Sequence, residues 1–185
     1  WITLIGSIFA IVVVKQLFGG LGHNFMNPAL AARAVMLASW PVQMTSWTTP
    51  GADAVSTATP LAVLKGIEGG QAAGIMDMLL GNTAGCIGET SALLLLLGGI
   101  YLIYRGVISY HIPVIYIATV AVLSFLFSGF QVSAISYNVL AGGLMLGAFF
   151  MATDYASSPV NIKAQIVYAF GCGLLTTVIR YFGGY

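Results

Sequence analysis

The chain has 185 residues, of which 59% are hydrophobic and 6% are charged, and its net charge is +1. A soluble domain usually carries about a quarter charged residues, so these charges are too few to cover a surface in water. A net charge this small also excludes a basic nucleic-acid-binding surface. Most of the exterior must therefore face lipid, in keeping with the mean hydropathy of +0.97.

The hydrophobic residues occur in long runs without alternation, as in 93–103 and 112–127. In lipid every backbone amide needs a partner inside the protein, and an unbroken apolar run meets that need as a helix. The sequence therefore predicts an all-α fold, a polytopic transmembrane helix bundle. We expect residues 1–185 to form a single transmembrane domain, the middle part of a longer chain, because apolar sequence is already running at Trp1.

The first predicted span runs from Trp1 to about Phe18 and approaches the roughly 20 apolar residues that cross a bilayer. A glycine-rich stretch ends it, and a polar turn follows at 23–27. Asn27 before a proline is a strong helix start and predicts a helix over 28–39. This helix is too short to span comfortably, so we interpret it as a half-helix whose positive N-terminal end points at the polar turn.

Residues 43–71 are rich in Thr, Ser, Gly and Pro and predict a loop. A short apolar piece follows at 72–80 and predicts a re-entrant or interfacial segment. A second glycine-rich break covers 81–88, and Glu89 is expected to start a helix that ends near Tyr104.

Three further spans are predicted over 112–128, 137–151 and 164–182, which gives about five spanning helices and two short pieces. Small residues at helix-packing spacing indicate close contacts between these helices. The glycines concerned are Gly143 and Gly147, and Gly171 beside Gly173.

The basic residues predict the orientation, because Lys and Arg gather in cytoplasmic loops. Following the spans along the chain places Lys15, Arg33, Arg105 and Lys163 on or near one side. Most of the acidic residues belong to the other side. The first side is therefore predicted to be cytoplasmic, and the loop at 45–71 is predicted to be extracytoplasmic.

Within that loop, the segment 53–61 is small and rich in hydroxyl groups. Thr59 lies between Ala58 and Pro60, so little bulk covers its hydroxyl, and the proline favours an extended backbone before it. Taken on the residues alone, a side-chain-supported turn between two helices accounts for this segment.

The same segment resembles a flavinylation motif, D-x-x-[S/T]-[G/S/T]-A-T-x-L, whose last Thr carries FMN through a phosphoester. The matching residues are Asp53, Ser56, Thr57, Ala58, Thr59 and Leu61. Thr57 stands where many members of the family have Gly or Ser. The resemblance therefore adds a functional alternative to the simple turn.

Three other segments are similar to signatures of one family and follow in the same order. They are G-L-G-H-N-F-M-N-P-A-L-A-A-R-A from residue 20, G-C-I-G-E-T-S from residue 85, and A-T-D from residue 152 with S-S-P from residue 157. Cys86 replaces a more usual Ser. The family joins the D component of the Rnf complex with the B subunit of the Na⁺-pumping NADH:quinone reductase, and the sequence looks closer to the Rnf component.

The resemblance implies an electron-carrying subunit of a ferredoxin:NAD⁺ oxidoreductase that translocates Na⁺ or H⁺ across a prokaryotic plasma (inner) membrane. It implies covalent FMN on Thr59, with Asp53 read by the flavin transferase, and a fold similar to ammonium and urea channels. The implied partners include the FMN-bearing G subunit and iron–sulfur membrane subunits. NAD⁺ would be reduced elsewhere, so no catalytic residue, and no complete active site, is expected on this chain alone.

The polar turn before the half-helix is a second candidate site. The related quinone-reductase subunit binds noncovalent riboflavin near this signature, which makes Asn24 and Asn27 candidate flavin ligands. Arg33, farther along the half-helix, is a candidate to pair with an acid or to neutralise a reduced flavin. The alternative for the two asparagines is that they only cap the helix.

Two acids near helix ends are candidates for the ion pathway, because ionisable groups at membrane depth are costly and often functional. Asp154 resembles a position implicated in ion uptake in the sister family, and Glu89 is the second candidate. The alternatives are a loop acid near Lys163 for Asp154 and helix-dipole pairing for Glu89. The spacing of His23 and His111 gives no metal motif, so no metal site is predicted.

Two other functions stay open at this point. One is the B subunit of the Na⁺-pumping NADH:quinone reductase, within the same family. The other is a channel or permease without a redox role, because half-helices and glycine breaks also suit a transporter. A permease would have no need of a flavin-motif Thr.

Overall fold

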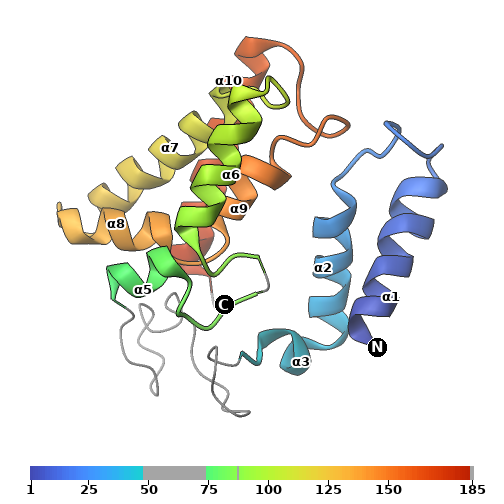
Figure 1. The fold of residues 1–185 in the computed structure, drawn as a ribbon, viewed down its shortest axis with the longest axis horizontal. Coiled ribbons are helices and arrows are strands. Elements are labelled where there is room, and N and C mark those ends of the chain that lie inside the picture. The colour runs from blue at the N-terminus through green and yellow to red at the C-terminus, as the bar shows by residue number, and fades with distance from the viewer. Residues whose placement is uncertain (48–73, 87, 184–185) are drawn as a thin grey trace. The chain divides into compact units, whose positions relative to one another are not determined.

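The computed structural model describes residues 1–47, 74–86 and 88–183, and every regular element within them is helical. This confirms the all-α prediction. The elements, shown in Figure 1, are α1 (Ile2–Ile8), η1 (Phe9–Gln16), α2 (Pro28–Ser39), α3 (Pro41–Thr45), α5 (Ile75–Leu80), α6 (Ala92–Tyr104), α7 (His111–Phe127), α8 (Val132–Leu140), α9 (Leu144–Leu146), η2 (Gly147–Met151) and α10 (Ile162–Phe182). The segments η1 and η2 are π-helical and continue α1 and α9.

The chain divides into two compact units. The first comprises 1–46 together with 154–159, and the second comprises 47–153 and 160–185. In the first unit, α1 and η1 form an antiparallel pair with α2 (Figure 1). The rings of Trp1 and Trp40 meet edge to face at 5.1 Å at one end of this helical hairpin.

The turn of the hairpin depends on glycines. Gly19 and Gly20 have φ angles of 111° and 87°, a left-handed region that residues with a Cβ avoid. These conformations stop η1 at Gln16 and lead the chain into the polar turn. Asn27 and Pro28 then start the next helix, so α2 begins and ends as the sequence predicts.

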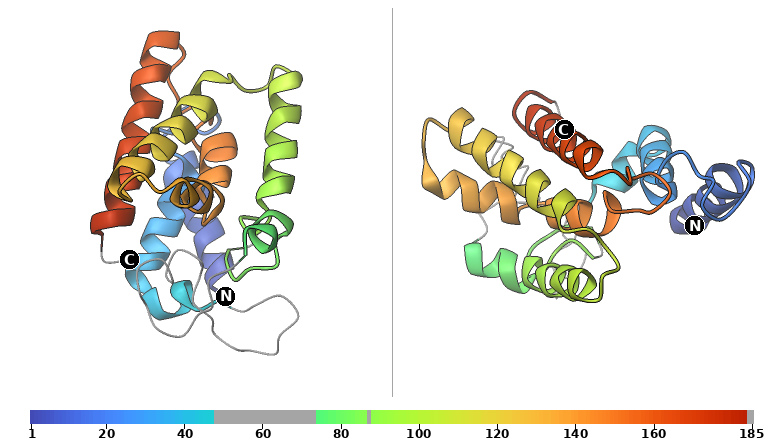
Figure 2. Two further views of the ribbon diagram at one scale, coloured as in Figure 1. Left: turned by 90° about the vertical axis from the view of Figure 1, so that its left-hand side faces the viewer. Right: turned by 90° about the horizontal axis from the view of Figure 1, so that it is seen from above.

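In the second unit, α7 and α10 lie side by side (Figure 2). A Cβ added at Gly173 of α10 would lie 2.6 Å from the Cβ of Thr119 and 3.1 Å from the carbonyl oxygen of Tyr116. The tyrosine hydroxyl is also 2.7 Å from the Thr176 hydroxyl of α10. The absence of a side chain at Gly173 therefore sets how closely the two helices approach, as the glycine spacing predicts for this position.

We expect Gly173→Ala to destabilise the protein by about 1–3 kcal/mol, because the added methyl group has no room against α7. Gly171→Ala is the matched control, since a Cβ there meets nothing within 4 Å. Thermal unfolding of the two variants in one detergent measures the difference. Equal midpoints for both would contradict the assigned role of Gly173.

The predicted span over 137–151 is not one continuous helix. The structure has α8, then a break, then α9 with η2, and the two parts are bent by 65°. Ala141 is extended, with ψ at 138°, and Gly142 has a φ of 68°. The glycine pair at 142–143 therefore breaks the helix that its apolar sequence would continue.

The start of α6 also differs from the prediction. The helix begins at Ala92, and its cap is Ser91, whose hydroxyl accepts a hydrogen bond from the Leu94 N–H at 3.4 Å. Glu89 lies in the turn before the helix instead of in its first turn. A hydroxyl next to the helix competes better for the open N–H groups than an acid two residues farther away.

Among the described residues one helix, α10, is long and apolar enough to cross a membrane, and α8 with α9 and η2 would form a second, bent span. Four more apolar helices have 10–17 residues: Ile2–Gln16, Pro28–Ser39, Ala92–Tyr104 and His111–Phe127. The architecture gives no support to the expected likeness to ammonium and urea channels. The predicted short pieces correspond to α2 and α5.

Candidate functional site

The predicted flavin attachment segment lies outside the described residues. This applies to all of its motif residues: Asp53, Ser56, Thr57, Ala58, Thr59 and Leu61. It applies also to nearly all of the predicted loop at 45–71, of which 45–47 alone are described. Covalent FMN at Thr59 therefore stays a prediction made from the sequence.

Asn27 caps α2. Its side-chain oxygen accepts hydrogen bonds from the N–H groups of Ala29 and Leu30, at 3.0 and 3.2 Å. These groups are among the four that a helix leaves unpaired at its N-terminus. Of the two roles considered for Asn27, the capping role is the one that its contacts display.

Asn24 has a different role. It is buried, and its amide nitrogen donates to the Met26 carbonyl at 3.0 Å and to the Asp154 carboxylate at 3.4 Å. The same Asp154 oxygen accepts a hydrogen bond from the Ser157 hydroxyl at 2.8 Å. Asp154 thus joins the polar turn to a segment 130 residues later, and the sequence-predicted residues Asn24 and Asp154 belong to one polar cluster.

This cluster limits how the turn can bind a flavin. An amide has two N–H donors, and those of Asn24 are directed at Met26 and Asp154. The Asn27 oxygen is held by the helix N-terminus. Donation of a hydrogen bond from Asn24 to a flavin would therefore require its amide to release Met26 or Asp154.

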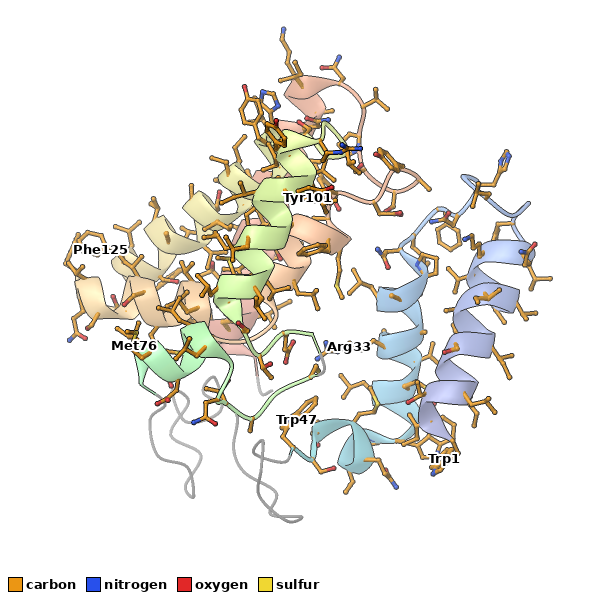
Figure 3. The ribbon with its side chains drawn as sticks, in the orientation of Figure 1. Trp1, Arg33, Trp47, Met76, Tyr101 and Phe125 are labelled. Atoms are coloured by element: carbon orange, nitrogen blue, oxygen red, sulfur yellow. The ribbon has the colours of Figure 1, made fainter. Side chains whose placement is uncertain are left out.

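Arg33 extends from α2 on the side away from α1 (Figure 3). Its side chain is exposed within the described residues, about one and a half turns into the helix. The hydrogen bonds that join Asn24, Asp154 and Ser157 are made at the turn, before the helix begins.

A pair of variants separates the two roles of Asn27. We expect Asn27→Ala to destabilise the protein by about 1 kcal/mol, because the N-cap is lost, and Asn27→Ser to cost only a few tenths, because Ser also caps. Thermal unfolding measures stability, and extraction of noncovalent flavin from the purified complex measures binding. A stable Asn27→Ser protein that has lost riboflavin would show that the amide binds flavin.

Glu89 is held in the second unit. Its carboxylate accepts a hydrogen bond from the Cys86 N–H at 3.0 Å. Its other oxygen lies where a side chain at Gly143 would be, at 2.8 Å from an added Cβ. Glu89 therefore faces the break between α8 and α9 from the segment that precedes α6.

The sequence interpretation missed the residues on the other side of this break. Arg180 of α10 donates hydrogen bonds to the carbonyl oxygens of Asn138 and Ala141, the latter at 3.0 Å. The Asn138 side chain is buried and donates to the Tyr181 hydroxyl at 3.4 Å. A single Arg inside the apolar run at 164–182 is the signal that could have found them, since an intramembrane charge needs a partner.

An apolar helix of 21 residues and a chain with few charges together indicate a helical membrane protein. The sequence matches the model of the NQR2, RnfD, RnfE family over residues 1–185. The chain therefore belongs to this family, which confirms the resemblance found in its motifs.

Three similar proteins show which member of the family the chain resembles, and each of them is named as the D component of a complex. Over the whole chain, 57% of residues are identical to this component of the Na(+)-translocating ferredoxin:NAD(+) oxidoreductase complex of Acetobacterium woodii. Identity is 48% to that of the proton-translocating ferredoxin:NAD(+) oxidoreductase complex of Clostridium ljungdahlii. It is 39% to that of the ion-translocating oxidoreductase complex of Alcanivorax borkumensis. The chain spans 58%, 60% and 61% of the lengths of these three relatives.

Proposed function

We propose that this protein is the D component of an ion-translocating ferredoxin:NAD⁺ oxidoreductase complex, and that it carries electrons on FMN bound covalently to Thr59. The observation that carries the proposal is the similarity over the whole chain to two proteins named as the D component of ion-translocating ferredoxin:NAD(+) oxidoreductase complexes, and to a third named as that of an ion-translocating oxidoreductase complex. The flavinylation motif at 53–61 supports the covalent FMN. The FMN-bearing G subunit and the iron–sulfur membrane subunits are the proposed partners.

Location and orientation form part of the proposal. We place the protein in a prokaryotic plasma membrane as a multi-pass subunit, with the loop at 45–71 on the extracytoplasmic side, because the basic residues favour the opposite side. The apolar helices of 10–17 residues support several crossings when they are combined with half-helices.

The flavin would supply the redox chemistry, and this chain would supply its position and electrostatic surroundings. For the translocated ion we propose Asp154 first and Glu89 second as pathway residues. The structure supports Asp154 through its place between two segments of the first unit. Glu89 is supported by its approach to a helix break in the second unit.

The relatives do not favour the rival functions. All three are named as subunits of ion-translocating oxidoreductase complexes, and none of these names denotes a quinone reductase or a permease. Quinone-dependent oxidation of NADH by the intact complex would instead indicate the quinone-reductase B subunit. Ion movement without any bound flavin would indicate a permease.

The test of the proposed function is the fluorescence of one protein band. The full complex is purified from its membrane, denatured in SDS and separated, and the gel is viewed under ultraviolet light. A fluorescent band at the size of this subunit supports covalent flavin, and mass analysis of the peptide that contains Thr59 gives the attachment. A band without fluorescence, from a complex that still reduces NAD⁺, would contradict the proposal.

A further inference from the structure

The break between α8 and α9 exposes backbone carbonyl groups inside an apolar helix bundle. The last four carbonyls of a helix have no partner within it. Here the Arg180 guanidinium reaches across from α10 and donates hydrogen bonds to the carbonyl oxygens of Asn138 and Ala141. Arg180 thus satisfies two carbonyls that would otherwise lack a donor.

The charge of these groups explains why a cation occupies the break. A helix C-terminus carries partial negative charge, and the carbonyl ends of broken helices coordinate cations in membrane transporters. A guanidinium presents several N–H donors in a planar fork, so one side chain can serve two carbonyls at once. Arg180 therefore occupies the position that a bound cation would take.

A carboxylate approaches the same break from the opposite segment. Glu89 comes close to Gly143, which lies two residues after the Ala141 carbonyl that Arg180 binds. Gly143 has an ordinary φ of −77°, so its backbone does not require glycine. A side chain at this position would have to displace the Glu89 carboxylate.

The surroundings add polar groups of the kind that bind small cations. The Tyr181 hydroxyl donates to the Ser124 carbonyl at 3.3 Å and accepts from Asn138. The hydroxyl of Ser124 is fully buried and is the one buried side-chain polar atom among the described residues that lacks a hydrogen-bond partner. Such an orphaned group in a bundle interior indicates a place that a water molecule or a small ion completes.

We propose that the break between α8 and α9 is a carbonyl site for a monovalent cation, and that the Arg180 guanidinium is its built-in occupant, with Glu89 as the counter-charge. The guanidinium ties the C-terminal end of α8 to α10 without a bound ion. The inference rests on contacts within the second unit and is independent of the flavin.

The decisive test removes the occupant and offers a replacement. Arg180→Ala in the full-length subunit, purified with its complex, is expected to lower the unfolding midpoint by about 5 °C or more, because two hydrogen bonds from a charged donor are lost. Millimolar guanidinium chloride, far below denaturing concentrations, should restore at least half of that loss. Na⁺ should restore a smaller part, and choline at equal ionic strength should restore none. The wild type should respond to none of the three.

Matched variants keep the test decisive. Arg105→Ala removes an exposed Arg and should leave the midpoint unchanged. If Arg180→Ala yields no stable protein, Arg180→Lys and Arg180→Gln decide, because Lys keeps the cation and Gln keeps only a neutral donor. We expect the Lys variant to retain more stability than the Gln variant. Equal losses in both would overturn the proposal, as would an equal response of wild type and Arg180→Ala to guanidinium.

The counter-charge is tested separately. Gly143→Ala should lower the midpoint because its methyl group displaces Glu89, whereas Gly147→Ala should not, since a Cβ there meets nothing within 4 Å. The double variant Glu89→Gln with Gly143→Ala should lower the unfolding midpoint by less than the sum of the two single decreases. Strict additivity would overturn the role of Glu89 at this site.

Discussion

Thr59→Ala is expected to remove all covalently bound flavin from the subunit, because the phosphoester proposed for FMN needs the hydroxyl of this residue. The loss should be complete, since alanine offers no oxygen with which to form the bond. In-gel fluorescence after SDS denaturation measures it directly. Ferredoxin-dependent NAD⁺ reduction by the complex should fall with it, if electrons pass through this flavin.

The control is a residue of the same motif. Thr57→Gly alters a hydroxyl-bearing residue two positions away, and the motif accepts Gly there, so this variant should keep its flavin. Asp53→Asn should greatly reduce the flavin without changing the attachment residue, because the flavinylation motif implies that the transferase reads this acid. Fluorescence of the Thr59→Ala band that survives denaturation would show that another residue carries the flavin.

The start of α2 could be predicted because the residues that determine it lie next to one another in the sequence. Asn27 and Pro28 start α2, and its length of 12 residues agrees with the sequence interpretation. Capping depends on residues within one turn of each other, so the sequence contains what is needed to predict it. The choice between a cap and a flavin ligand at Asn27 needed the hydrogen bonds of the structure.

The helix break was missed because its cause looks like a packing signal. Gly143 with Gly147 has the spacing of residues at a close helix contact, and the apolar residues around them continue without interruption. In the structure, an added Cβ at Gly147 meets nothing within 4 Å, and one at Gly143 meets Glu89. Both facts depend on the positions of residues far away in the sequence.

The sequence could not predict which polar residues form hydrogen bonds with distant partners, for the same physical reason. Asn138 and Arg180 are 42 residues apart, and Asn24 and Asp154 are 130 apart. Each residue by itself is a polar group in an apolar context, which signals that a partner exists without naming it. The sequence therefore gives Asn24 and Asp154 as separate candidates, and the structure joins them by a hydrogen bond.

Asp154→Asn is the second substitution from which we expect a large effect. The change keeps the size of the side chain and its ability to accept a hydrogen bond from Ser157, while it removes the negative charge. If Asp154 binds the translocated cation, about 1.5–3 kcal/mol of charge-assisted interaction is lost. Each 1.4 kcal/mol or so corresponds to a tenfold change in binding, so the half-saturating ion concentration should rise about tenfold or more.

The measurement is ferredoxin-dependent NAD⁺ reduction by the complex in vesicles, over a series of Na⁺ concentrations and of pH values. Both series are needed because one relative is named for Na⁺ and another for protons. Asp77→Asn is the acidic control, since the Asp77 carboxylate lies in the first turn of α5. It should leave the ion dependence unchanged.

A structural role for Asp154 predicts a different pattern, which Ser157→Ala exposes. That variant removes the 2.8 Å hydrogen bond to Asp154 and keeps the charge. If Asp154 only joins the polar turn to the later segment, both variants should lower the unfolding midpoint, and neither should change the half-saturating ion concentration. If Asp154 binds the ion, only Asp154→Asn should raise that concentration. The charge, and not the hydrogen bond, would then be what the ion requires.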